Sequence, residues 1–286
     1  KLEQGAFYKV TNINEIVDIW FAFWDKAFIG LKPYVYSASI NLFYTVLAIT
    51  IVLSIAYYII SVLILIEKKK KNISIGKDYT PFVTIQIPTY NELAAINCAK
   101  KCIKFDYPKE KYEILIGDDS NDTDVSMKLM AFADKYTCVK VIKRENNVGY
   151  KPGNLNNMIK YSNGDILVIF DSDFLPERDF LRRIVMPFAD DDKICAVQSR
   201  WSMIRPHRNL ISSLSSTILA VVHHVVLPFS EKTKAALLCG SAEAVRKDVL
   251  IKLGGWKLQC LTEDIEYSLR ALIAGYKIKY IDDLKC

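Results

Sequence analysis

The pattern of hydrophobic and polar positions divides the chain into four segments. No charged residue occurs from Ile40 to Ile66, and this run exceeds the roughly 20 apolar residues that cross about 30 Å of hydrocarbon, so residues 40–66 are predicted to form a transmembrane helix. Residues 1–39 mix aromatic and charged side chains, which is typical of an amphipathic segment at a membrane interface. Residues 67–80 form a basic linker, and residues 81–286 alternate between strand-like and helix-like patterns.

Four short apolar runs in residues 81–286 alternate with segments of helical length. Short, fully apolar strands between helices favour a mostly parallel sheet with helices on both faces, and hence an α/β fold. The predicted strands are Val83–Ile87, Ile114–Ile116, Val139–Ile142 and Ile166–Phe170. The predicted helices are Glu92–Lys104, a stretch that ends near Tyr136, and one that is opened by Pro152.

Each predicted strand is followed by a polar cluster. Because ligands of such sheets bind beyond the carboxyl ends of the strands, we expect one crevice to collect these side chains. The clusters are Pro88–Glu92 (PTYNE), Asp118–Ser120 (DDS), Asn146–Asn154 (NNVGYKPGN) and Asp171–Asp173 (DSD).

Asp171 and Asp173 lie one residue apart at the end of an apolar strand. Alternation along a strand predicts that both carboxylates point the same way, so that they can share a divalent cation and the oxygens of a phosphate. The alternative interpretation is that they cap a following helix, which Pro176 and Glu177 would open.

Asp119 and Lys151 each have a structural and a functional interpretation. Asp119 follows Asp118, and it either forms part of a turn or accepts hydrogen bonds from a nucleobase or ribose. Lys151 lies between Gly149 and Gly153, and it is either a solvated surface lysine or a point charge for a diphosphate beside exposed backbone N–H groups.

A helix is predicted to begin after Thr262, a suitable N-cap, and to end at Gly275. Glu263 and Asp264 lie in its first turn, where they either complement the helix dipole or supply a general base in Asp264. A helix N-terminus favours the ionised carboxylate and so weakens it as a base. Burial or nearby acids would have to offset this effect.

The charge pattern indicates a bilayer, and not a nucleic acid, as the partner of this chain. Lys68–Lys71 follow the predicted span directly, so the positive-inside rule places the downstream domain in the cytoplasm, and the net charge of +6 needs no nucleic acid to explain it. The seven cysteines include no C-x-x-C pair, which favours reduced thiols over disulfides or zinc.

A second apolar run, Leu210–Phe229, lies inside the predicted cytoplasmic domain. Serines interrupt it, so we do not expect it to form a second span. His223 and His224 lie within this run and are assigned to packing or to an interface, not to the site.

Seven motifs in order resemble those of the membrane-bound family 2 glycosyltransferases, the group of cellulose synthase, the glucan and mannan synthase-like proteins, and hyaluronan synthase. They read IQIPTYNE, GDDS, RENNVGYKPGNLN, DSD, QSRW, CGSAEAVRKDVLIKLGGW and LTEDIEYSLRALIAGY. The resemblance covers about Val83 to Ile281. It implies the GT-A fold, a Rossmann-like α/β architecture, and a glycosyltransferase activity.

The resemblance also implies a role for each motif. The nucleotide of the donor would contact Pro88, Tyr90, Glu92, Asp119 and Lys151. Asp171 and Asp173 would bind Mn²⁺ or Mg²⁺ and the diphosphate, and Asp264 would be the catalytic base. The acceptor would be bordered by Cys239, Gly240, Ser241 and Glu263. The implied reaction is inverting transfer of a hexose, from a donor of the UDP-glucose or GDP-mannose type, to a polysaccharide or other hydroxyl at the membrane.

Alternatives to a polysaccharide synthase are a glycosyltransferase with a lipid acceptor and a non-catalytic nucleotide-sugar-binding module. A haloacid-dehalogenase-type phosphatase, with Asp171 as nucleophile, is disfavoured because that pattern has Thr or Val where this chain has Leu175. Processive members carry a later Q-x-x-R-W motif, and Gln198–Trp201 is a different element. We expect that motif in a region beyond Cys286 that is truncated here.

Overall fold

The computed structural model describes residues 13–29, 32–68, 79–204, 206 and 208–286. The chain divides into two compact units, residues 1–63 and 64–286. The predicted basic linker, residues 67–80, lies outside the described residues except at its two ends. Residues 1–12 of the predicted amphipathic segment lie outside them as well.

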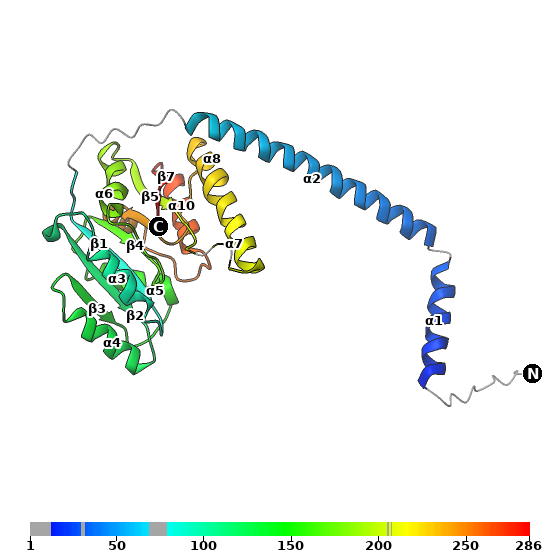
Figure 1. Cartoon of the computed structure of the whole chain (residues 1–286), viewed down its shortest axis with the longest axis horizontal. Coiled ribbons are helices and arrows are strands. Elements are labelled where there is room, and N and C mark those ends of the chain that lie inside the picture. The colour runs from blue at the N-terminus through cyan, green and yellow to red at the C-terminus, as the bar shows by residue number, and fades with distance from the viewer. Residues whose placement is uncertain (1–12, 30–31, 69–78, 205, 207) are drawn as a thin grey trace, which may run out of the picture. The chain divides into compact units, whose positions relative to one another are not determined.

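Two helices form the described part of the N-terminal region, α1 (Ile13–Ile29) and α2 (Lys32–Lys68) (Figure 1). On α1, aromatic side chains such as Trp20 and Phe23 are exposed, as expected for an interfacial helix. Within α2, Tyr34–Leu63 is a 30-residue stretch with an 18-residue window of mean hydropathy 2.5, which is long and apolar enough to cross a membrane. Serine and threonine hydroxyl groups along this stretch donate to carbonyls of the preceding turn, as Thr50 Oγ1 does to Val46 O at 2.8 Å, and such bonds pair these groups within the helix.

The described part of residues 64–286 contains a seven-stranded sheet with the order β3-β2-β1-β4-β6-β5-β7. All strand pairs are parallel except those of β6, which runs antiparallel to both β4 and β5. The strands are β1 Val83–Thr89, β2 Tyr112–Asp118, β3 Val139–Lys143, β4 Ile166–Ile169, β5 Ile194–Arg200, β6 Glu243–Arg246 and β7 Lys277–Lys285.

Helices cover both faces of this sheet because successive residues of its central strands point to opposite sides. Ile85 and Val168 enter a hydrophobic core with residues of α3, α4 and α6. Leu115 and Leu167 enter a second core with residues of α5, α9 and α10. The helices are α3 Ala94–Cys102, α4 Thr123–Ala133, α5 Tyr150–Ile159, α6 Phe180–Val185, α7 Leu210–Val221, α8 Leu227–Lys232, α9 Lys247–Lys252 and α10 Glu263–Ile273, with single turns η1 Lys109–Lys111 and η2 Met186–Ala189 and a π-helical segment η3 Val222–Val226.

The structure confirms the four predicted strands, β1 to β4, with ends that differ by at most two residues. The predicted mostly parallel α/β architecture is therefore confirmed. The prediction that a helix begins at Pro176 and Glu177 is wrong. The following helix, α6, begins only at Phe180, where buried Phe180 and Leu181 supply an apolar face. Asp171 and Asp173 therefore do not cap it.

Residues 210–232 form one continuous helical stretch made of α7, η3 and α8. Its length of 23 residues and an 18-residue window of mean hydropathy 1.8 also satisfy the requirement for a membrane span, although Leu210–Phe229 was not expected to be one. None of the α7 residues is buried, so this helix does not pack as part of the core. His223 in η3 is buried, which confirms its assignment to packing, whereas His224 is half-exposed beside Asp282.

Candidate active site

The loop that precedes the antiparallel strand β6 lies at the edge of the sheet where β1, β2 and β4 end. Glu243, the first residue of β6, pairs with Ile169, the last residue of β4. Thr89 at the end of β1 is likewise in register with Asp118 at the end of β2. The loop 239–242, which precedes β6, therefore reaches the carboxyl edge of the parallel strands, where the polar clusters were predicted to meet.

Lys151 lies at the centre of this edge. It stands in the first turn of α5, after Gly149, whose φ of 74° suits glycine. Its Nζ donates to Asp171 Oδ1 and to the carbonyl oxygen of Gly240, both at 2.6 Å. Burial disfavours its charge, but the carboxylates of Asp171, Glu243 and Glu263 outweigh burial and raise the pKa of Lys151. Lys151 is thus a fixed cation in the cluster and not a solvated surface lysine.

Asp171 and Asp173 lie in a turn and not on a strand. Strand β4 ends at Ile169, and the N–H of Phe174 donates to the carbonyl of Asp171 at 3.1 Å, so the alternation argument for their orientation is wrong. Asp171 is partly exposed and Asp173 is exposed. Between them, Ser172 is buried and its hydroxyl donates to Glu92, which joins the PTYNE and DSD segments.

Asp119 is held by an arginine that the sequence interpretation did not single out. Arg144 Nε donates to Asp119 Oδ1 at 2.6 Å, and Arg144 Nη2 donates to Oδ2, so the pairing is bidentate. The Asp119 side chain is only 5% exposed. Its neighbour Asp118 is fully buried and accepts from Ser126 Oγ at 2.6 Å, which gives Asp118 a structural role.

The CGS segment, Cys239–Ser241, is held by the QSRW segment on β5 and just beyond it. Gln198 Oε1 accepts from Cys239 N at 2.8 Å, and the indole N–H of Trp201 donates to Ser241 O at 2.8 Å. Ser241 is fully buried, and its hydroxyl accepts from Asp171 N at 2.8 Å. The two segments therefore position the loop against the DSD turn.

Two acids, Glu263 and Asp264, enter the cluster from the first turn of α10. A Cβ placed on Gly240 would lie 3.3 Å from Asp264 Oδ2 and 3.6 Å from Lys151 Nζ, so Gly240, with its φ of 85°, leaves room for both groups. Glu263 Oε1 lies 4.0 Å from Lys151 Nζ. Burial and the charges of Asp264 and Asp171 outweigh Lys151 and raise the pKa of Glu263. Thr262 is the N-cap residue as predicted, but its side chain makes no capping bond.

Glu243 is a further acid of this cluster, and the sequence interpretation did not include it. It is 1% exposed and accepts from Gly240 N at 2.9 Å. Burial, followed by the neighbouring charge of Asp264, raises the pKa of Glu243 to about 8. The only signal in the sequence was an acid inside an otherwise apolar strand, CGSAEAV, and recognising it required the prediction of β6.

The structure thus brings most of the predicted site residues into contact. Lys151, Asp171, Gly240, Ser241 and Asp264 adjoin one another, and Glu92 joins them through Ser172. Cys239 and Glu263 border the same cluster, and Pro88 lies within β1 as it approaches this edge. Tyr90 and Asp173 are exposed to solvent.

Among the described residues, no group of three or more His, Cys, Asp or Glu side chains is arranged to hold a metal ion by itself. The candidate ligands are two carboxylates, Asp171 and Asp173. Hard divalent cations often bind to one or two carboxylates and take their other ligands from water and from substrate phosphates. The carboxylates of Asp171 and Asp173 therefore suit Mg²⁺ or Mn²⁺ that takes further ligands from a diphosphate.

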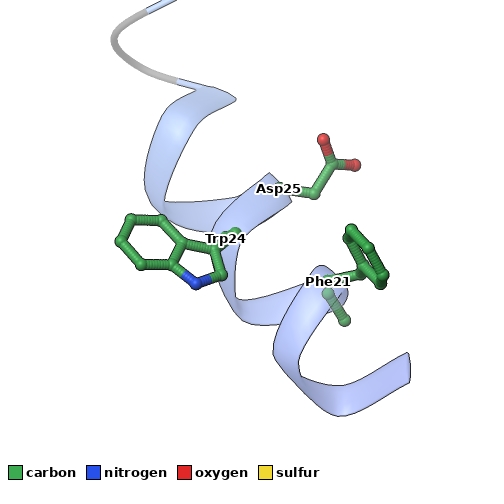
Figure 2. A pocket seen from close by; sticks show the side chains of 4 residues that line it. Phe21, Trp24 and Asp25 are labelled. Atoms are coloured by element: carbon green, nitrogen blue, oxygen red, sulfur yellow. The ribbon is translucent and has the colours of Figure 1, made fainter. Parts of the chain in front are cut away.

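A shallow hollow elsewhere in the chain has no comparable chemistry. Phe21, Trp24 and Asp25 line it on the single helix α1 (Figure 2). The hollow lies in the N-terminal unit and collects one carboxylate and two aromatic rings. We therefore take the cluster around Lys151, and not this hollow, as the candidate site.

The substitution Glu243→Gln is expected to flatten the dependence of stability on pH. The pKa of Glu243 is about 8 when folded against 4.5 normally, so the folded state retains a proton that the unfolded state releases, and stability falls as the pH rises between these values. The loss reaches up to about 5 kcal/mol at roughly 1.4 kcal/mol per pKa unit, and a neutral Gln avoids it. Chemical unfolding in detergent at about pH 5 and about pH 8 measures the difference.

The control for this prediction is Glu110→Gln, at an exposed position outside the site. Its stability should follow that of the parent at both pH values. If Glu243→Gln also runs parallel to the parent, Glu243 does not carry the buried proton.

A comparison with protein families shows a match to the model of glycosyl transferase family 2 over residues 84–254. This range begins in β1 and ends just after α9, so it contains all the strand-end segments described above except the first turn of α10. It covers more than half of the chain.

The chain is also similar to characterised proteins and solved structures. Glucomannan 4-beta-mannosyltransferases 9 and 7 of Arabidopsis thaliana are 32% and 30% identical over 229 residues, which are 77% of this chain and 43% and 41% of those proteins. The mannosyltransferase PcManGT from Pyrobaculum calidifontis, solved in complex with GDP-Man and Mn²⁺, superposes with a TM-score of 0.61 at 25% identity, over 84% of this chain and 67% of that one. The chain therefore spans about two fifths of the length of these Arabidopsis relatives.

Proposed function

This chain belongs to glycosyl transferase family 2, and we propose that it catalyses inverting transfer of a hexose from a nucleotide sugar to a hydroxyl group of a growing polysaccharide. The fold is GT-A, as the resemblance of the motifs implied. The observation that carries the proposal is the convergence of Lys151, Asp171, Gly240 and Asp264, which places a cation, an exposed carboxylate turn and a buried acid within one cluster.

The donor that we propose is GDP-mannose. The Arabidopsis relatives are named as mannosyltransferases, and the Pyrobaculum enzyme was solved with GDP-Man. The alternative is UDP-glucose. Within the site, Asp119 is the candidate contact for the nucleoside, and Arg144 holds its carboxylate in place by the bidentate pair. Pro88, Tyr90 and Glu92 would line the same side.

Asp171 and Asp173 would hold the divalent cation of the donor complex. When bound, Mn²⁺ or Mg²⁺ supplies positive charge that stabilises a diphosphate leaving group. Lys151 is placed for the same purpose, since its ammonium group already contacts Asp171. It would bind an oxygen of the diphosphate and stabilise the charge that develops as the glycosidic bond to the nucleotide breaks.

Asp264 is proposed as the base that takes the proton from the acceptor hydroxyl. The acceptor oxygen then attacks the anomeric carbon from the face opposite the diphosphate, which inverts the configuration. Asp264 is buried in the first turn of α10, next to Glu263 and close enough to Glu243 for its charge to act on that acid. Cys239, Gly240, Ser241 and Glu263 would border the acceptor.

Turnover of the purified chain with GDP-mannose and UDP-glucose tests this proposal. Release of nucleoside diphosphate, with incorporation of the sugar into an oligosaccharide primer, is expected from GDP-mannose in the presence of Mn²⁺. Binding of a donor without turnover would favour a non-catalytic nucleotide-sugar-binding module. Transfer to a lipid alcohol, and none to the oligosaccharide, would favour a glycolipid-forming enzyme.

The chain is further proposed to be an integral membrane protein whose site faces the cytoplasm. The span Tyr34–Leu63 supports the attachment, and the basic residues 68–71, of which 69–71 lie outside the described residues, support the orientation. Protease added to sealed vesicles with the cytoplasmic side inside is expected to leave residues 79–286 intact. Detergent-opened vesicles, as control, should lose them. Digestion in sealed vesicles would contradict the orientation.

A further inference from the structure

The indole ring of Trp201 contacts both the CGS segment and the DSD turn. Its N–H donates to the carbonyl oxygen of Ser241 at 2.8 Å. Its ring lies edge-on to that of Phe174, with 5.3 Å between the centroids and 72° between the planes. Phe174 follows Asp173 directly, and its N–H closes the DSD turn by donating to the carbonyl of Asp171. One half-buried side chain thus joins the turn to the segment that precedes β6.

Ser241 is the point at which the two segments are tied together. It is fully buried, and its hydroxyl accepts from Asp171 N at 2.8 Å. Its carbonyl oxygen accepts from Gln198 Nε2 at 3.0 Å in addition to the indole N–H. The carbonyl of the preceding residue, Gly240, accepts from Lys151 Nζ at 2.6 Å. A shift of Ser241 would therefore displace the groups that border both Asp171 and Lys151.

A second ring, that of His223 in η3, packs against Trp201. The two ring centroids lie 5.5 Å apart with 35° between the planes, and His223 is 1% exposed. The backbone N–H of Trp201 donates to His223 Nδ1 at 3.4 Å, so this nitrogen is an acceptor and the ring is neutral. Tyr280 on β7 donates its hydroxyl to the carbonyl of His223 at 2.7 Å. These contacts connect Trp201 to β7 and fix its place beside the sheet.

The proposed reaction requires the CGS segment at a fixed distance from two groups. Gly240 adjoins the proposed base, since a Cβ placed on Gly240 would lie 3.3 Å from Asp264 Oδ2. Ser241 holds the same segment against Asp171. The acceptor hydroxyl must meet the base and the anomeric carbon at the same time, and a displacement of about 1 Å can cost about 10²-fold in rate. A side chain that fixes Ser241 can therefore act on the rate without touching the substrate.

We propose that Trp201 is a positioning residue for sugar transfer, which acts through Ser241 to hold the CGS segment against the DSD turn. His223 and Phe174 keep the indole ring in place, so His223 serves the site from outside it. This inference rests on the proposed transferase function, and it adds to that function a residue that contacts neither donor nor acceptor.

Trp201→Phe and Trp256→Phe are a matched pair of substitutions in the full chain. Both remove an indole N–H and the same atoms. The indole N–H of Trp256 has no hydrogen-bond partner among the described residues, and its ring packs against that of Tyr267 with centroids 5.2 Å apart. Trp201→Phe is expected to lower transfer from GDP-mannose to an oligosaccharide primer by about 10-fold to 100-fold, as for a misplaced reacting group. Trp256→Phe should transfer at a rate close to that of the parent.

The balance between transfer and donor binding distinguishes positioning from a general loss of structure. Donor affinity, measured by calorimetry, should stay close to that of the parent in both variants, because Lys151 and Asp171 still contact each other at 2.6 Å. Hydrolysis of the donor should fall less than transfer in Trp201→Phe, because water needs no ordered acceptor segment. A loss of donor affinity as large as the loss of transfer would contradict the proposal.

Hydrogen exchange tests the same contact without turnover. The amide groups of residues 239–242 should exchange faster in Trp201→Phe than in the parent, and as in the parent in Trp256→Phe. Phe174→Leu repeats both measurements if Trp201→Phe fails to fold, which circular dichroism reveals. Transfer by Trp201→Phe at the parent rate would overturn the proposal, and so would unchanged exchange of residues 239–242. A parent that transfers no sugar would contradict the proposed function, and the exchange measurement would then still decide whether Trp201 holds the segment.

Discussion

Asp264→Asn is expected to lower sugar transfer by about 10² to 10⁴, the usual worth of a positioned general base. The amide has nearly the size of the carboxylate and keeps a polar group in the first turn of α10, but it cannot accept the proton of the acceptor hydroxyl. Donor affinity should remain close to that of the parent, because the donor contacts proposed here are Lys151, Asp171 and residues further along the sheet edge. The measurement is the rate of transfer from GDP-mannose at saturating donor, together with donor binding by calorimetry.

The competing explanation for Asp264 is that it only complements the dipole of α10. In that case the same substitution costs no more than about 1 kcal/mol of stability and leaves turnover nearly unchanged. Glu266→Gln is a suitable control, since Glu266 lies in the same first turn but forms an ion pair with Arg270. Thermal unfolding of both variants must accompany the rates, because a misfolded variant would imitate the loss of a base. A folded Asp264→Asn variant that binds donor and transfers sugar at the parent rate would contradict the mechanism.

Removal of divalent metal is expected to lower the affinity for GDP and GDP-mannose by about 10-fold to 100-fold, which corresponds to about 1.5–3 kcal/mol for interactions with a charged group. Without a cation, the carboxylates of Asp171 and Asp173 repel the diphosphate, and Lys151 is already paired with Asp171. Asp173→Ala should lose affinity to a similar extent in the presence of Mn²⁺. Calorimetric titration of the full chain with and without EDTA measures both effects.

A matched control separates the metal site from a general effect of negative charge. Asp192 is a fully exposed aspartate at the other end of the sheet, just before β5. Asp192→Ala should leave affinity and its dependence on Mn²⁺ as in the parent. If EDTA has no effect, or if Asp173→Ala binds donor as the parent does, then Asp171 and Asp173 do not hold a metal for the donor.

Much of the first half of the catalytic domain could be predicted from local sequence. Strands β1, β2 and β4 are apolar runs because both faces of the sheet are covered. The polar residues that follow each run mark the end of the strand. The direction of a parallel strand then places PTYNE, DDS and DSD at one edge whatever the details of packing. The candidate span in α2 is likewise a local feature, since the length of Tyr34–Leu63 and its lack of charge are enough to predict it.

The strands of the second half of the domain were harder to predict from the sequence, because they do not repeat that pattern. Strand β6 has four residues, includes buried Glu243 and runs antiparallel to its neighbours, so neither apolar continuity nor helix–strand alternation indicates it. For the same reason the partner of the CGS loop could not be named in advance. Gln198 and Trp201, 41 and 40 positions away from the groups that they hold, are brought there only by the pairing of β5 with β6.

The sequence by itself determined the succession of a long apolar helix and an α/β domain, the identities of the residues at the strand ends, and the family to which their order points. The tertiary structure decided the relations among those residues. It showed that Asp171 and Asp173 lie in a turn, that Arg144 holds Asp119, and that Glu243 is buried against the cluster. The physical reason is that hydrophobic periodicity records only whether a position is buried. A pKa or an ion pair depends on which charged groups are neighbours. These groups are far apart in sequence and come together only when the strands pair and the helices pack on the sheet.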